Sequence, residues 1–110
     1  MKINSFMKDH NSEIKNIILG FDGEFNSHDF IKKFMKEYEL FYIEKLVDYK
    51  GKGAFRSVNS QIAKFLSLNK EALGIEKSHF YSSENVFGDP DKIQWWINGK
   101  IKNRENSHSK

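Results

Sequence analysis

The spacing of apolar residues changes once along this chain, at Gly74 and Ile75, and this change sets the fold class. Before it, apolar side chains recur every three or four residues, as in amphipathic helices. After it, residues 79–87 are rich in aromatic, Ser and Val residues, and residues 92–97 contain Ile93, Trp95, Trp96 and Ile97. A turn signal at 88–91, which holds the only proline, separates these two segments. The sequence therefore predicts a mostly α-helical protein with a small β-hairpin, an α+β fold.

Two helical segments are predicted before the glycine-rich loop at 50–53. Residues 13–19 form a short helix capped by Asn11 or Ser12. Ser27 is the expected N-cap of a longer segment that holds two sets of apolar residues at helical spacing. The first set is Phe30, Ile31, Phe34, Met35 and Tyr38. The second set is Leu40, Ile43, Leu46 and Val47. The phase shifts near 38–39, which indicates two helices meeting at a kink or tight turn, while one long helix remains an alternative.

Two further helices are predicted after the loop. Ser57 is the expected cap of a helix that ends near Ser67, with apolar positions at Val58, Ile62, Phe65 and Leu66. Asn69 caps a short helix over 70–73, and Gly74 ends it because glycine tolerates the left-handed cap conformation.

The segment 58–75 resembles a helix-turn-helix. That motif has a small residue where the helices cross, a small residue in the turn, an apolar turn residue in the core and an apolar anchor on the second helix. These positions hold Ala63, Ser67, Leu68 and Leu73. With the hairpin, residues 27–97 resemble winged helix-turn-helix domains in their architecture. The resemblance implies a single winged-helix-like domain over 13–97 that binds double-stranded DNA.

Both ends of the chain are polar. Residues 1–12 are expected to form a flexible N-terminal arm, and residues 98–110 a disordered basic tail.

Composition excludes several classes of protein. The chain is 38% hydrophobic and 15% aromatic, enough for a folded core. It has no cysteine, which excludes disulfides, thiolate zinc sites and a cysteine nucleophile and fits a reducing cytoplasm. No apolar run is long enough for a signal peptide or a membrane span. We therefore expect a cytoplasmic protein without membrane contact.

Charge is unevenly distributed. Residues 1–49 hold seven Lys and nine Asp or Glu, whereas residues 50–110 hold eleven Lys or Arg and six Asp or Glu. The basic second half favours binding to a polyanion, although an ordinary lysine-rich surface has the same composition.

Either helix of the motif could contact DNA. The second offers Lys70, but Glu71 repels phosphate and Gly74 keeps the helix short, so the preceding helix is the alternative reader. The residues expected to neutralise phosphates are Lys50, Lys52, Arg56, Lys64 and Lys77, and those expected to reach base edges are Asn59, Ser60 and Gln61. Lys92 lies near the base of the wing, with Lys77. Of Trp95 and Trp96, which alternate along a strand, at least one is expected in the core.

The sequence shows no catalytic or metal-binding pattern. The four histidines are not paired at metal-ligand spacing, and no nucleophile elbow or phosphate loop occurs. We therefore predict a protein that is not an enzyme and uses no metal or cofactor. The leading hypothesis is a DNA-binding transcriptional regulator or mobile-element accessory factor. The alternative is a protein–protein interaction module on the same scaffold, such as a phage-type inhibitor of a nuclease complex.

Overall fold

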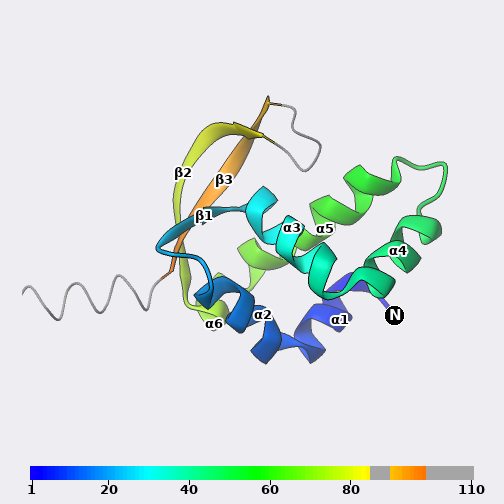
Figure 1. The fold of residues 1–110 in the computed structure, drawn as a ribbon, viewed down its shortest axis with the longest axis horizontal. Helices are drawn as coiled ribbons and strands as arrows, with labels where there is room; N and C mark the ends of the chain where they lie inside the picture. The colour runs from blue at the N-terminus through cyan, green and yellow to red at the C-terminus, as the bar shows by residue number, and fades with distance from the viewer. Residues whose placement is uncertain (85–89, 99–110) are drawn as a thin grey trace, which may run out of the picture.

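A computed structural model describes residues 1–84 and 90–98, with the backbone alone described for 79–84 and 90–93. Six helices and three strands follow one another in the described residues: α1 (Ile3–Asp9), α2 (Asn11–Leu19), β1 (Glu24–Asn26), α3 (Ser27–Glu37), α4 (Glu39–Asp48), α5 (Ala54–Leu68), α6 (Lys70–Leu73), β2 (Ile75–Glu84) and β3 (Pro90–Asn98). Figure 1 shows the sheet at one end of the molecule and α4 at the other. The predicted α+β class is confirmed.

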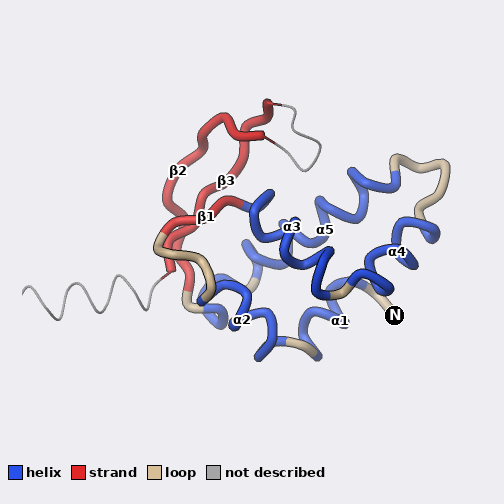
Figure 2. Tube along the Cα trace, in the orientation of Figure 1, coloured by secondary structure: helices blue, strands red, loops and turns tan. Residues whose placement is uncertain are grey.

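The three strands form one antiparallel sheet in the order β1-β3-β2. Trp96 in the central strand pairs with Phe25 on one side and Lys77 on the other. The register shifts between Lys77 and Phe80, as at a β-bulge. Figure 2 shows the small sheet against a much larger helical body. This arrangement is compatible with a winged-helix architecture. The sequence did not predict β1, because a strand of three residues is too short to show an alternating pattern.

The hairpin differs in detail from its prediction. Pro90 and Asp91, expected in the turn, are the first residues of β3, while Gly88 and Asp89 lie outside the described residues. Asn98, expected to begin the tail, is the buried last residue of β3. The rest of the predicted tail, 99–110, lies outside the described residues.

The buried core joins the sheet to the helices through Trp96. Its side chain is 1% exposed, and its indole Nε1 donates a hydrogen bond to Ser27 Oγ at 3.1 Å. The largest fully buried side chains around the core also include Phe25, Phe30, Phe34 and Phe65. The prediction that at least one tryptophan is in the core is confirmed.

The N-cap of α3 is Asn26 rather than Ser27. Asn26 Oδ1 accepts from the backbone N–H of Asp29 at 2.8 Å, and the Asp29 carboxylate accepts from the backbone N–H of Asn26, which completes a capping box. Ser27 is therefore free to bind Trp96.

The expected flexible arm over 1–12 is wrong, because residues 3–9 form α1 and residue 11 begins α2. Ile3 and Met7 are buried, and α1 packs against α5. Phe6 stacks on Phe41 of α4 with 3.7 Å between ring centroids. The polar residues between these side chains face outward, so the average composition concealed a short amphipathic helix.

The boundaries of α5 also differ from their prediction. It begins at Ala54, three residues before the expected Ser57 cap, and Gly53 adopts the left-handed conformation at its start. Ser57 instead donates to the backbone carbonyl of Lys52 at 3.0 Å. Leu68, expected to enter the core, is the last residue of α5 and 69% exposed. The short helix α6 and the left-handed Gly74 that ends it are confirmed.

The packing of α1 leads to a stability prediction. Met7→Ala should lower the free energy of unfolding by about 2–5 kcal/mol, since it removes a fully buried side chain. Urea denaturation measures this loss. Exposed Lys8 in the same helix is the control, and Lys8→Ala should change stability by less than about 0.5 kcal/mol. Equal, small effects at both positions would mean that residues 1–12 are an arm after all.

Candidate nucleic-acid interface

The outward face of α5 is the candidate interface. Its fifteen residues include no Asp or Glu. Val58, Ile62, Phe65 and Leu66 are its buried residues, while Arg56, Ser60 and Lys64 are exposed. Residues four apart lie on one side of a helix, so these three side chains form a row. We call this row, Arg56, Ser60 and Lys64, the α5 row.

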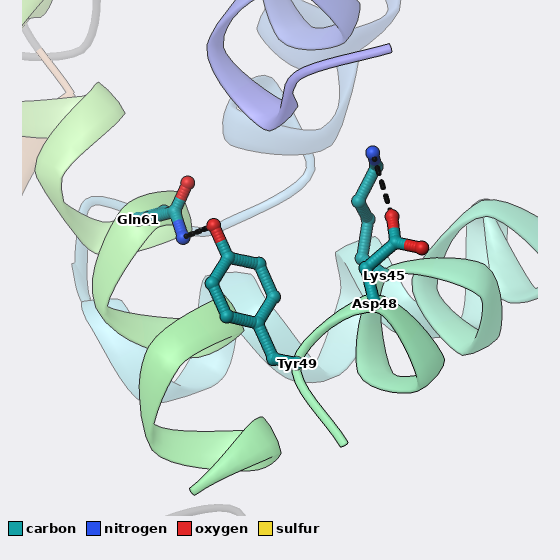
Figure 3. A network of polar contacts seen from close by, with 4 residues as sticks. All are labelled: Lys45, Asp48, Tyr49 and Gln61. Atoms are coloured by element: carbon teal, nitrogen blue, oxygen red, sulfur yellow. Dashed lines mark hydrogen bonds and ion pairs between the residues drawn. The ribbon is translucent and has the colours of Figure 1, made fainter. Parts of the chain in front are cut away.

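Asn59 and Gln61 lie outside the α5 row. Successive helical residues are separated by roughly 100° around the axis, so residues 59 and 61 lie on opposite flanks of residue 60. Asn59 Oδ1 accepts a hydrogen bond from the Tyr42 hydroxyl at 2.7 Å. The Gln61 amide Nε2 donates to the Tyr49 hydroxyl at 2.7 Å, as Figure 3 shows, and to the Ser57 carbonyl at 3.2 Å. Both amides, expected to face the same side as Lys64, thus hold α5 against Tyr42 of α4 and against Tyr49, the residue that follows α4.

The two tyrosines are the polar residues whose role the sequence did not reveal. Tyr42 and Tyr49 are seven positions apart, which is about two helical turns, so both lie on the side of α4 that faces α5. Burial raises the pKa of Tyr42, while its hydrogen bond to Asn59 lowers it, and the net shift is upward. Tyr42 therefore stays protonated at neutral pH and keeps its donor role. Their spacing was visible in the sequence, but their partners on another helix were not.

The other predicted cations fall into two groups. Lys50 and Lys52 are exposed in the loop that leads into α5, next to Arg56 along the chain. Lys77 is exposed at the start of the hairpin. Lys92, expected beside it at the base, instead pairs with Ser82 near the turn end of the hairpin, because β3 runs antiparallel to β2, and its side chain lies outside the described residues. The structure therefore places cations before α5, along it and at the base of the hairpin.

The helix α6 is poorly suited to read DNA. It has only four residues, with Lys70 half-buried and Glu71 exposed. The Asn69 side chain turns back to donate to the Phe65 carbonyl at 3.0 Å instead of capping α6. A hollow of about 140 Å³ beside it is lined by Lys15, Leu19, Glu71, Ala72, Leu73, Gly74 and Asn98. Lys70 lies on α6, which is a different helix from the one that carries the α5 row.

Metal-binding clusters and membrane-spanning helices are both absent from the described residues. Within the part of the chain that the structure describes, no three His, Asp or Glu side chains are grouped as a metal site. His10, expected in the arm, stacks on Phe6, and its Nδ1 lies 2.8 Å from the Phe6 carbonyl. None of the described helices combines the length and apolar character needed to cross a bilayer.

No protein-family model, curated protein or solved structure matches this chain. Its class is therefore defined by its own elements, a small α+β protein whose helices pack on a three-stranded antiparallel sheet.

The contact between α4 and α5 leads to a second prediction. Tyr42→Phe should destabilise the protein by about 1 kcal/mol because the Asn59 amide loses its donor. A double-mutant cycle with Asn59→Ala, followed by chemical denaturation, should give a coupling energy of about 0.5–1.5 kcal/mol. The matched cycle with exposed Ser60→Ala should give additive effects. A coupling as large with Ser60 as with Asn59 would contradict the assigned contact.

Proposed function

We propose that this protein binds double-stranded DNA through the α5 row, with the hairpin of β2 and β3 serving as a wing. The observation that carries this proposal is the exposed, carboxylate-free face of a fifteen-residue helix. A helix fits the major groove, which is about 12 Å wide. Any carboxylate on that face would be repelled by the phosphates on either side.

The spacing of the α5 row suits a groove-bound helix. Arg56 and Lys64 are eight residues apart, which is about 12 Å along the helix axis. Both are long cations that can reach phosphates, and either can pair with guanine in the major groove. Ser60 lies between them, and its short hydroxyl lets the helix approach the base edges closely. This row replaces the expected set of Asn59, Ser60 and Gln61 as the base-facing group.

The surrounding cations would fix the position of α5 on the duplex. Lys50 and Lys52 would contact phosphates at the N-terminal end of the helix, and Lys77 would contact them from the hairpin. Asn59 and Gln61 would act as positioning residues, because their bonds to Tyr42 and Tyr49 set the orientation of α5. Such a protein would act in transcription regulation or as an accessory factor of a mobile element.

The test compares two lysines in a salt titration. Lys64→Ala should weaken binding to a random duplex and reduce the slope of log K against log salt by about one. Fluorescence anisotropy from low to physiological salt measures both quantities. Lys36→Ala, which removes an exposed lysine from α3, is the matched control and should leave the slope unchanged.

A charge introduced into the α5 row makes the test sharper. Ser60→Glu should abolish binding at low salt, because it places a carboxylate between two phosphate-contacting cations. Circular dichroism should show an unchanged fold, since Ser60 is exposed. If the wild-type protein does not bind duplex at low salt, or if Lys36→Ala weakens binding as much as Lys64→Ala, the proposal is wrong.

A further inference from the structure

The outer face of α4 carries an apolar stripe that DNA binding does not explain. Leu40 is 78% exposed, Ile43 is 48% exposed and Val47 is 64% exposed. Their spacing of three and four residues places them side by side along one face. Single exposed apolar residues are ordinary on protein surfaces, whereas a contiguous patch marks an interaction site. We call these three residues the α4 stripe.

Acidic side chains border the α4 stripe on both sides. At roughly 100° per residue, Glu39 lies beyond one edge, and Glu44 and Asp48 lie beyond the other. All three are exposed. The single cation of α4 is Lys45, whose side chain is 12% exposed. Its Nζ bonds Asp48 at 3.1 Å, as Figure 3 shows, and sits 5.5 Å from the Phe41 ring centroid. The stripe is therefore apolar at its centre, with the carboxylates of Glu39 and Glu44 at its two borders and the Asp48–Lys45 pair beside Glu44.

A hollow adjoins the stripe where the start of the chain approaches α4. It has a volume of about 410 Å³ and is lined by Met1, Phe41, Ile43, Glu44, Lys45, Val47 and Asp48. Met1 is 67% exposed, so its side chain extends the apolar surface beyond α4. A ridge beside a hollow offers both a surface and a recess to the side chains of an incoming helix.

We propose that the α4 stripe docks an amphipathic helix of a partner protein, whose apolar residues are bordered by Lys or Arg. Such a helix complements both the apolar centre and the acidic borders. A second copy of this chain would instead bring its own Glu39, Glu44 and Asp48 against the same residues, and anionic lipid would meet the same repulsion. The stripe is also small. Leu40 and Val47 are seven residues apart, which is about 10 Å along the helix axis. Three side chains over that length suit a single docked helix better than a stable dimer interface, which buries roughly 800 Å² per partner.

This docking surface is separate from the proposed DNA-binding face. Tyr42 and Tyr49 mark the side of α4 that meets α5, and the α4 stripe lies on the side away from them. Figure 1 shows α4 at the end of the molecule opposite the sheet, away from the proposed wing. A partner helix on α4 could thus be held while the α5 row is occupied, and the docking proposal does not depend on the DNA-binding one.

The test uses two synthetic helical peptides that share a leucine stripe at three- and four-residue spacing. One has lysines along both borders of the stripe, and the other has glutamates. Titration calorimetry should detect binding of the lysine peptide and at least tenfold weaker binding of the glutamate peptide. Amide chemical-shift changes in the labelled protein should concentrate on residues 39–48.

Variants separate the stripe from its borders. Leu40→Ser with Val47→Ser should weaken the lysine peptide at least tenfold without loss of stability, because both side chains are exposed. Leu68→Ser is the matched control at an equally exposed leucine outside α4 and should leave the affinity unchanged. Glu44→Lys should shift the preference toward the glutamate peptide.

Three outcomes would overturn the proposal. One is that the two peptides bind equally or that neither binds. Another is that the wild-type chain dimerises in sedimentation while the Leu40→Ser, Val47→Ser variant stays monomeric, which would make a second copy the occupant. The third is that the stripe variant loses affinity for anionic vesicles, which would make a lipid surface the occupant.

Discussion

The fold depends on Trp96, because this residue ties together segments that are distant in sequence. Its backbone pairs with β1 on one side and β2 on the other. Its indole is buried and donates to Ser27 at the start of α3. A buried indole N–H without a partner would cost free energy, so sheet and helix must meet where Ser27 is placed. The Asn26 capping box fixes that place, since it determines where α3 begins.

The helix α5 is the second organising element. It packs against α1, α3, α4 and α6, while its α5 row stays exposed. The tyrosine–amide bonds on both flanks set how the helix is rotated about its axis. This rotation decides which polar residues face outward. It brings Arg56 and Lys64 into one row and directs Asn59 and Gln61 toward the tyrosines at α4.

The structure converts an uneven sequence charge into two distinct faces. The acidic excess of residues 1–49 includes the borders of the α4 stripe, and the basic excess of residues 50–110 includes the α5 row. The two faces lie on the adjacent helices α4 and α5. The α4 stripe is on the side of α4 that faces away from α5. A protein with this arrangement is suited to contact a polyanion on one side and a basic partner helix on another. The two proposals are therefore compatible within one small fold.

By itself, the sequence determined the α+β class, the short helix α6 with its left-handed Gly74, and the burial of at least one tryptophan. It favoured a break between α3 and α4 but left one long helix open, and the structure shows two helices. These features follow from local spacing and from backbone preferences that act within a few residues. Only the tertiary structure decided that the helix over residues 3–9 contributes to the core and that β1 joins the sheet. It also decided that Leu68 is exposed. The hydrogen bonds from Tyr42 to Asn59 and from Gln61 to Tyr49 were likewise settled by packing. Each of these depends on which segment packs against which. A polar side chain has the same sequence pattern whether it faces water or a tyrosine hydroxyl on a neighbouring helix, and packing alone distinguishes the two.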